Sequence, residues 1–186
     1  MRIISGKYRG LKLNSFEGSD IRPTADRVKE SLFNILYSEI SGARVLDLFC
    51  GSGSLGIECL SRGAAFVDFN DISPASVKLL KGNLSRLKGE SNFTFTVTTG
   101  DYSAFLARAK APYDIIFIDP PYADDCGIYA LRSVGERRLL REGGVAVYER
   151  DRPFEGEISG LEVCDERKYG KTYLTFFRPC GGKEQL

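Results

Sequence analysis

The chain has 186 residues, of which 42% are hydrophobic and 27% charged, and its formal net charge is +1. This length suits one α/β domain with a short extension and excludes two full domains. The sequence has no histidine, which excludes Ser-His-Asp and Cys-His nucleophilic machinery, histidine general bases and nearly all catalytic zinc sites. Any chemistry must therefore use carboxylates, backbone groups, tyrosine, lysine or a cofactor.

The cysteine pattern and the lack of long apolar runs indicate a cytoplasmic protein. The five cysteines are scattered and form no C-x-x-C pair, so neither a disulfide framework nor a zinc site is expected. No apolar run approaches the about 20 residues of a membrane span, and the first residues lead into basic ones rather than into a signal peptide. We predict no metal, no membrane association and, without a recognisable dimerisation element, a monomer.

The first 22 residues predict a basic N-terminal arm. Residues 2–13 have the pattern of a short β-hairpin around Gly6–Gly10, with four cationic residues and no acidic one through Lys12. A hairpin with so few charges is by itself typical of a solvated surface. If the target is a nucleic acid, however, the cationic groups and Tyr8 are suited to contact phosphates and bases.

The rest of the chain predicts helices that alternate with strands. A first helix begins at Pro23, has Thr24 as a candidate cap, and ends at Gly42. Strands are expected at 44–49, 66–70, 93–98, 113–119 and 144–148, helices near 54–61, 74–87, 102–109 and 127–140, and a closing hairpin at 161–167 and 172–178. This alternation predicts a Rossmann-like α/β domain over residues 23–180, with a seven-stranded, mostly parallel sheet, an antiparallel strand near the C-terminus, and a disordered tail at 181–186.

A glycine-rich loop follows the first strand of this alternating part. The segment Asp47-Leu-Phe-Cys-Gly51-Ser-Gly53-Ser-Leu-Gly56 places G-x-G-x-x-G between a strand and a helix, as in nucleotide-cofactor sites. Asp47 would repel a pyrophosphate but would attract a sulfonium cofactor that carries an ammonium group. Glycine at 51 and 53 would let the backbone approach such a ligand closely.

Acidic residues also follow the second and third strands. Asp71 is placed to accept hydrogen bonds from ribose hydroxyls, and Asp101 from an adenine amino group. Each acid alone is as often a helix cap or a solvated turn. Three acids at successive strand ends favour a ligand that carries an ammonium, a ribose and an adenine.

The sequence Asp119-Pro-Pro-Tyr122 follows the fourth strand and is the candidate catalytic loop. An exocyclic base nitrogen is a poor nucleophile because its lone pair is delocalised into the ring. Asp119 and the carbonyl of Pro120 would accept its two hydrogens and turn the lone pair toward a methyl donor, while consecutive prolines stiffen the loop. Tyr122 offers a flat face for a flipped base, worth about 1–3 kcal/mol. Without the cofactor loop, Pro-Pro would be an ordinary strand stop and Tyr122 a core residue.

These motifs resemble those of class I methyltransferases that act on amino groups. The chain, from R-I-I-S-G-K-Y-R-G through R-P-T-A-D-R-V-K-E-S-L-F-N-I-L to E-R-K-Y-G-K-T, is similar over residues 1–178 to the bacterial family that methylates N2 of a guanine in 16S ribosomal RNA. The arm and the R-P-T-x-D-R-V segment distinguish this family from other D-P-P-Y enzymes. The resemblance implies S-adenosylmethionine as donor and 16S rRNA in the 30S subunit, or in an assembly intermediate, as substrate.

The resemblance also implies roles for individual residues. Residues expected to hold the cofactor are Asp47, Phe49, Gly51, Gly53, Asp71, Ile72, Asp101, Tyr102, Thr24 and Arg27. The target guanine would meet Asp119, Pro120, Pro121 and Tyr122, and the RNA would meet Lys7, Tyr8, Arg9, Lys12 and Arg22, with a second candidate patch at Lys168, Lys171 and Arg178. Relatives often have glutamate where this chain has the shorter Asp71, so Asn70 would share the ribose contact.

Three other functions stay open on the sequence. An adenine-N6 methyltransferase would use the same loop, although the short arm leaves little structure for DNA recognition. A non-catalytic, RNA-binding ribosome-assembly factor would not need both Asp119 and the cofactor glycines. Protein amino-group methyltransferases often have asparagine at the position of Asp119.

Overall fold

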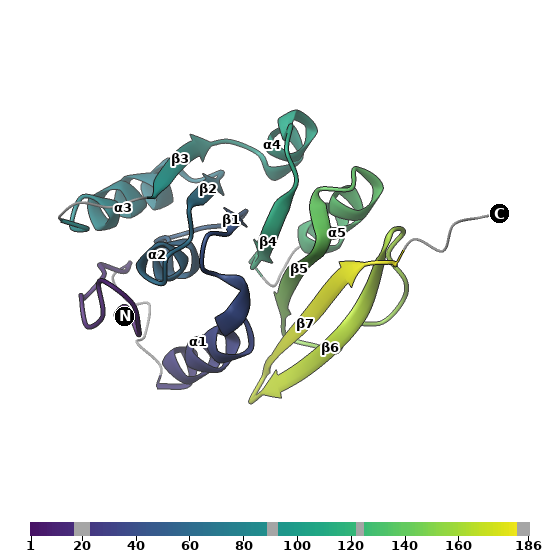
Figure 1. Cartoon of the computed structure of the whole chain (residues 1–186), viewed down its shortest axis with the longest axis horizontal. Coiled ribbons are helices and arrows are strands. Elements are labelled where there is room, and N and C mark those ends of the chain that lie inside the picture. The colour runs from purple at the N-terminus through teal and green to yellow at the C-terminus, as the bar shows by residue number, and fades with distance from the viewer. Residues whose placement is uncertain (17–22, 89–92, 122–124, 182–186) are drawn as a thin grey trace.

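Seven strands form one mixed sheet, in the order β3-β2-β1-β4-β5-β7-β6 (Figure 1). The computed structural model describes residues 1–16, 23–88, 93–121 and 125–181, and for residues 23–26 the backbone only. The strands are β1 Arg44–Asp47, β2 Phe66–Asp71, β3 Thr94–Thr99, β4 Tyr113–Ile118, β5 Leu140–Arg150, β6 Leu161–Tyr169 and β7 Thr172–Pro179. The helices are α1 Pro23–Ile35, α2 Ser54–Ser61, α3 Pro74–Leu84, α4 Tyr102–Arg108 and α5 Cys126–Glu136, with a short 3₁₀ helix, η1, at Tyr37–Glu39.

Helices cover both faces of the sheet because its central strands are apolar on both sides. In β4, Ile115 and Phe117 belong to one buried cluster, and Ile116 and Ile118 belong to the other. Helices α1, α2 and α3 pack on the first face, and α4 and α5 pack on the second (Figure 1). A strand covered on both faces is expected to be almost continuously hydrophobic, as β4 is.

The predicted fold class is confirmed, including the antiparallel strand near the C-terminus. Strands β3, β2, β1, β4 and β5 pair in parallel, and β7 runs antiparallel between β5 and β6. Among the described helices, none is long and apolar enough to cross a membrane.

Three predicted helix ends are wrong. The helix expected at 74–87 ends at Leu84, and two other helices end early for local backbone reasons. The helix expected to reach residue 140 ends at Glu136, because Arg138 adopts a left-handed conformation with φ of 51° and residue 140 already pairs with β4. The first helix ends at Ile35 rather than at Gly42, and the chain tightens into η1. The candidate cap Thr24 lies outside the described side chains.

The N-terminal arm forms a short antiparallel ladder that is docked on the domain. A bridge joins Arg2 to Lys12, and the Ile3 N–H donates to the Leu11 carbonyl at 3.0 Å. Ile3 is fully buried in the cluster shared with α1 and α2. The turn of the arm rests on the end of α2, where the Lys7 N–H donates to the Ser61 carbonyl at 2.7 Å.

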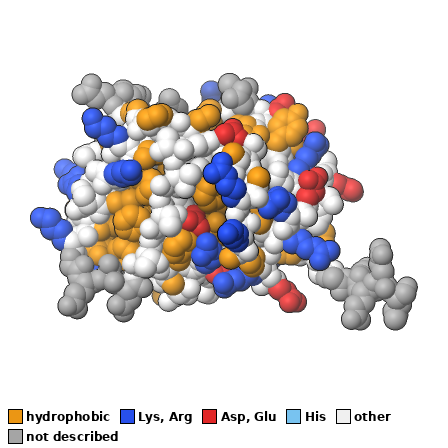
Figure 2. All heavy atoms as spheres, turned by 90° about the horizontal axis from the view of Figure 1, so that it is seen from above, with side chains coloured by type: hydrophobic (Ala, Val, Ile, Leu, Met, Phe, Trp, Pro, Cys, Tyr) orange, Lys and Arg blue, Asp and Glu red, His pale blue; other side chains and the backbone are white. Residues whose placement is uncertain are grey.

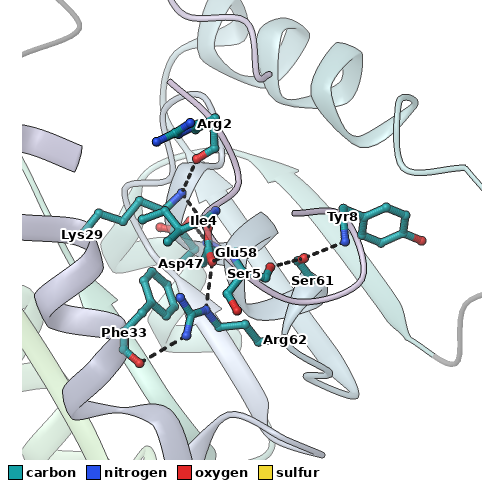
Figure 3. A network of polar contacts seen from close by, with 11 residues as sticks. Arg2, Ile4, Ser5, Tyr8, Lys29, Phe33, Asp47, Glu58, Ser61 and Arg62 are labelled. Atoms are coloured by element: carbon teal, nitrogen blue, oxygen red, sulfur yellow. Dashed lines mark hydrogen bonds and ion pairs between the residues drawn. The ribbon is translucent and has the colours of Figure 1, made fainter. Parts of the chain in front are cut away.

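Glu58 of α2 connects the arm to two helices (Figure 3). Its fully buried carboxylate accepts hydrogen bonds from the backbone N–H groups of Ile4 at 2.8 Å and Ser5 at 2.9 Å. The same carboxylate forms ion pairs with Lys29 of α1 at 3.0 Å and with Arg62, just after α2, at 2.8 Å. Burial alone would raise the pKa of Glu58, but Lys29, Ile4 and Arg62 together hold it below its ordinary value.

We expect Glu58→Gln to lower the free energy of unfolding by about 3 kcal/mol, because it leaves buried Lys29 without its charged partner. Urea unfolding measures this change, with the exposed Glu136→Gln as the control. Because the folded-state pKa of Glu58 is lowered, its stabilisation is present above the ordinary value of 4.5 and is lost as the pH falls through the lower folded-state pKa. A loss no larger than that of Glu136→Gln would contradict this role.

Candidate functional site

A cavity of about 740 Å³ lies at the carboxyl ends of the parallel strands. Parallel strands all present these ends at one edge of the sheet, where ligands of open α/β folds bind. Its wall includes the residues that follow each strand: Asp47, Phe49, Gly51, Asp71, Ile72, Asp101, Tyr102, Asp119, Pro120 and Pro121. The sheet therefore brings together most of the predicted cofactor and catalytic residues in one cavity of a size typical for a small ligand.

The two predicted glycines of the loop after β1 have different structural reasons. Gly51 lines the cavity with φ of 52°, and a Cβ there would meet no atom within 4 Å, so the requirement is the left-handed backbone. Gly53 has φ of 81° and is buried behind the loop, where a Cβ would lie 2.2 Å from Cδ1 of Leu80. Gly53 thus allows α2 to pack closely on α3, and it is not needed for a close approach of the backbone to a ligand.

Asp47 is a buried carboxylate whose pKa is raised to about 7. Burial is the main cause and the nearby Asp71 adds to it, while the N–H of Gly56, which donates to Oδ2 at 2.9 Å, and the charge of Lys29 oppose it. A ligand ammonium beside Asp47 would relieve this unfavourable charge. The position is therefore suited to the cationic, methionine end of the predicted cofactor.

The end of β2 presents one carboxylate and one unpaired amide oxygen. Asp71 accepts hydrogen bonds from the Gly51 N–H and the Ser73 N–H, both at 2.8 Å. Its neighbour Asn70 donates through Nδ2 to the carbonyls of Leu48 and Gly100, and its buried Oδ1 has no partner within the described chain. Since Asn70 also lines the cavity, this orphaned acceptor fits a ligand that brings a hydroxyl or ammonium donor.

The end of β3 combines a helix cap with aromatic and aliphatic surfaces. Asp101 caps α4 by accepting hydrogen bonds from the Ser103 and Ala104 N–H groups, and both use Oδ1. The rings of Phe49 and Tyr102 lie 5.4 Å apart at the cavity wall, and Ile72, which directly follows β2, is 69% exposed. Flat apolar surfaces near the other oxygen of Asp101 suit an adenine ring with its amino group.

The candidate catalytic loop borders the same cavity on the β4 side. Asp119 and Pro120 line it, and Tyr122 falls outside the described residues. Burial, then Glu149 and Asp47, raise the pKa of Asp119 well above its ordinary value. Behind the loop, Gly127 leaves room for it, because a Cβ there would lie 2.8 Å from Cγ of Pro120 and 2.5 Å from Cε2 of Tyr148.

Sequence reasoning missed two groups that share this wall, Glu149 at the end of β5 and Cys126 at the start of α5. The sequence pattern predicts that this strand ends at residue 148, which leaves Glu149 outside the predicted strand-end acids such as Asp47 and Asp119. The strand-end rule applied one strand further would have found Glu149. No sequence signal distinguishes Cys126.

Several predicted contacts lie away from the cavity. Arg27 is exposed on α1 and is not among the described lining residues, and Arg22 and the side chain of Thr24 are outside the described part. Tyr8 packs edge-on against Phe93 with ring centroids 6.3 Å apart, so its ring is partly used inside the fold. Lys168 lies near the β6–β7 turn, whereas Arg178 is at the other end of that hairpin, bound to Glu39, so the second patch is divided.

The hydrogen-bond acceptors and rings of the cavity wall fit S-adenosylmethionine. A buried carboxylate matches the ammonium, Asp71 and Asn70 offer acceptors for the ribose, and Asp101 with the two rings suits adenine. Among the described residues, no three potential ligands cluster as a metal site would require. Fold and site together define an S-adenosylmethionine-dependent methyltransferase.

The comparisons place the chain within one family of this class. It belongs to the family described as Conserved hypothetical protein 95, whose model matches residues 1–178. It is 36% identical over 157 residues to a ribosomal RNA small subunit methyltransferase D of Haemophilus influenzae, covering 83% of this chain and 81% of that protein. The Escherichia coli K12 protein of the same name is 42% identical over 122 residues, covering 66% of this chain and 60% of that protein.

Solved structures agree with this placement. A structure from Escherichia coli, named as the methyltransferase yhhF, superposes with a TM-score of 0.84 at 31% identity and covers 96% of this chain and 97% of its own. The structure of a Haemophilus influenzae protein named as a methylase, HI0767, superposes with a TM-score of 0.79 at 31% identity. The match covers 97% of this chain and 98% of that protein.

We expect Asp47→Asn to stabilise the protein at pH 8 by roughly 2–4 kcal/mol and to weaken cofactor binding. A folded-state pKa of about 7 against an ordinary value of 3.8 means that ionising Asp47 lowers stability as the pH rises from about 4 to 7. Asparagine keeps an acceptor for the Gly56 N–H without the charge. Thermal unfolding at pH 5 and pH 8, with and without S-adenosylhomocysteine, checks both parts, and Asp151→Asn is the exposed control. Equal stability differences at both pH values would contradict the buried-charge account.

We expect Gly127→Ala to reduce methyl transfer at least about 10-fold while cofactor affinity stays within about 2-fold, because the new Cβ displaces Pro120 and Tyr148. Gly82→Ala is the matched control, since a Cβ there meets nothing within 4 Å and the helix gains about 0.5–1 kcal/mol. Calorimetric titration with S-adenosylhomocysteine separates the two readouts. Unchanged methyl transfer in Gly127→Ala would show that the loop tolerates displacement.

Proposed function

We propose that the protein transfers a methyl group from S-adenosylmethionine to the exocyclic N2 amino group of a guanine in 16S ribosomal RNA. The observation that carries this proposal is that Asp119 and Pro120 share one cavity with Asp47, Asp71 and Asp101. A loop suited to an amino group is thus next to a row of acceptors suited to the methyl donor. The small-subunit rRNA methyltransferases named among the relatives support the RNA substrate.

The residues of the loop act on the amino group. When bound, the cofactor supplies an electrophilic methyl carbon on a sulfonium sulfur. Asp119 and the Pro120 carbonyl accept the two amino hydrogens, which localises the lone pair on nitrogen and directs it into the cavity. When the N–C bond forms and the C–S bond breaks, the nitrogen loses one proton, and Asp119, with its raised pKa, is the carboxylate placed to accept it.

The sheet order separates the cofactor end of the cavity from the base end. Asp101 and Asp71 follow β3 and β2 on one side of β1, whereas Asp119 follows β4 on the other side. The target base therefore enters from the side of β4 and β5. A non-catalytic assembly factor would have no use for this arrangement.

Cationic groups lie on two separate parts of the surface. Lys7, Arg9 and Lys12 lie on the docked arm, whose turn rests on the end of α2, and the exposed Arg152 and Lys168 lie just after β5 and near the β6–β7 turn. Figure 2 shows one face of the molecule, on which Lys and Arg side chains are spread among hydrophobic ones. Dispersed charges of this kind suit a folded RNA or an assembling 30S particle, and we infer that the protein acts there, in the cytoplasm and as a monomer.

Labelled S-adenosylmethionine, offered with unmodified 30S subunits, naked 16S rRNA, double-stranded DNA and a protein extract, tests this function. We expect N2-methylguanosine after nuclease digestion and mass analysis of the ribosomal samples alone. N6-methyladenine would keep the chemistry and overturn the target. Absence of transfer to every sample, despite tight cofactor binding, would favour the assembly-factor function.

We expect Asp119→Ala to lower methyl transfer at least about 100-fold while cofactor affinity changes little, because the substitution removes the acceptor of the amino hydrogens and leaves the β1–β3 side intact. Single-turnover transfer and calorimetric titration with S-adenosylhomocysteine measure the two effects. Asp114→Asn, at the opposite end of β4, controls for a general loss of charge. Full activity in Asp119→Ala would remove the loop from the mechanism.

A further inference from the structure

We propose that Glu149 reads the Watson–Crick edge of the target base by accepting the N1–H of guanine, and so excludes adenine. This inference rests on the proposed function, because it presumes a purine amino group held by Asp119 and Pro120. It assigns the choice of base to a residue outside the catalytic loop.

The register of the sheet places Glu149 beside Asp119. Strands β4 and β5 pair in parallel with Ile118 opposite Tyr148, so residues 119 and 149 are the next neighbours along the two strands. Adjacent strands lie about 4.8 Å apart, and side chains alternate between faces. Phe117 and Val147 belong to the same buried cluster, whereas Ile118 and Tyr148 belong to the other, so the alternation turns Asp119 and Glu149 toward the same side.

The lining of the cavity agrees with this placement. Glu149 lines the main cavity together with Asp119 and Pro120. It also lines a small adjoining hollow with Pro121, Arg150 and Arg152. Glu149 therefore lies at the base end of the cavity, on the side opposite the strands that carry Asp71 and Asp101.

The chemistry of the two purines explains why a second carboxylate at this place is selective. On its Watson–Crick edge, guanine presents an N1–H donor directly beside the N2 amino group, so two neighbouring acceptors match it. Adenine presents an N1 lone pair beside its amino group, and a carboxylate there would face an acceptor. The two acceptors formed by Asp119 and Pro120 accept either amino group, so discrimination requires a third group that only guanine satisfies.

The electrostatics of the free protein agree with a role in ligand binding. Glu149 is close enough to Asp119 to contribute to its raised pKa, so a negative charge on Glu149 repels the ionised form of Asp119 in the free protein. A base that donates hydrogen bonds to both carboxylates relieves this repulsion, whereas adenine relieves it at Asp119 alone.

A base analogue in the RNA tests the assignment. The methylated position is first mapped with the wild-type protein, and 16S rRNA is then assembled by ligation with either guanosine or 2-aminopurine riboside there and reconstituted into small subunits. 2-Aminopurine keeps the exocyclic amino group at C2 but has a lone pair in place of N1–H. We expect the wild-type protein to prefer guanosine by about 100-fold in kcat/KM.

Glu149→Gln is expected to lower that preference at least about 10-fold, because its amide can donate to the N1 lone pair. The intrinsic reactivities of the two amino groups cancel when this ratio is compared between proteins. Glu142→Gln, an exposed acid near the other end of β5, is the matched control and should keep the wild-type preference. Unfolding temperature and titration with S-adenosylhomocysteine verify that Glu149→Gln is folded and binds cofactor.

The outcomes separate this inference from the proposed function. If the wild-type protein forms no N2-methylguanosine, the proposed function fails. If it methylates guanosine but Glu149→Gln lowers transfer to both bases equally, the function stands and Glu149 has a structural role. Fluorescence of 2-aminopurine, which rises when the base leaves its stack, gives a readout that does not depend on methyl transfer. Weaker unstacking by the wild-type protein than by Glu149→Gln is the expected result, and equal unstacking contradicts the inference.

Discussion

The buried carboxylate of Glu58 is the contact on which the arrangement of this protein depends. An ionised group in a protein interior is unfavourable unless hydrogen bonds and opposite charges surround it. Here the backbone of the arm, a lysine of α1 and an arginine after α2 supply those partners. Three segments that are separate in the sequence therefore need the same side chain. Because α2 also begins with the cofactor loop, the arm is fixed relative to that loop rather than attached by a flexible link.

A second link ties the arm to the cofactor loop through α3. The buried side chain of Asn83 donates to the carbonyl of Ser52 in the loop at 2.9 Å. It also donates to the Asn14 carbonyl at 3.0 Å, and it accepts the Asn14 N–H at 2.8 Å. The cofactor loop is thus attached to both α2 and α3, and the same side chain, Asn83, also binds the end of the basic arm. An RNA bound by the arm would be positioned by the elements that position the cofactor.

Two carboxylates of the cavity wall contrast with Glu58. Glu58 is compensated within the folded chain and its pKa is lowered, whereas burial and the charge of neighbouring carboxylates raise the pKa values of Asp47 and Asp119. The direction of the pKa shift therefore distinguishes a carboxylate that the fold compensates from one that is available for a ligand. Groups that the fold itself satisfies stabilise it, and groups left partly unsatisfied at strand ends are those that a cationic or hydrogen-donating ligand completes.

The sequence predicts much of the sheet because its signals are local. Apolar runs such as 113–118 and strand-end acids such as Asp47 and Asp71 depend on neighbours a few residues away, and the class and order of elements follow from them. The contacts of the arm could not be predicted, since Glu58 lies in an ordinary helical stretch and its partners are 53 and 54 residues away. The bounds of β5 are not local either: the left-handed Arg138 precedes its start, and at its end Glu149 and Arg150 are held in the sheet by pairing with Leu174 and Tyr173 of β7. Site roles within the cavity stay predictions.

The geometry of the sheet suggests why base selectivity would lie on β5. A carboxylate followed by a carbonyl recognises an amino group, and guanine and adenine both present one. What differs is the ring nitrogen beside it, which lies to one side of the amino group rather than along the methyl-transfer direction. On the cofactor side of β4 that space belongs to β1 and Asp47, the carboxylate predicted to bind the ammonium. The remaining neighbour of β4 is β5, and the cavity-lining acid at its end is Glu149. The loop after β4 would then define the reacting group, and the strand beside it the base that carries that group.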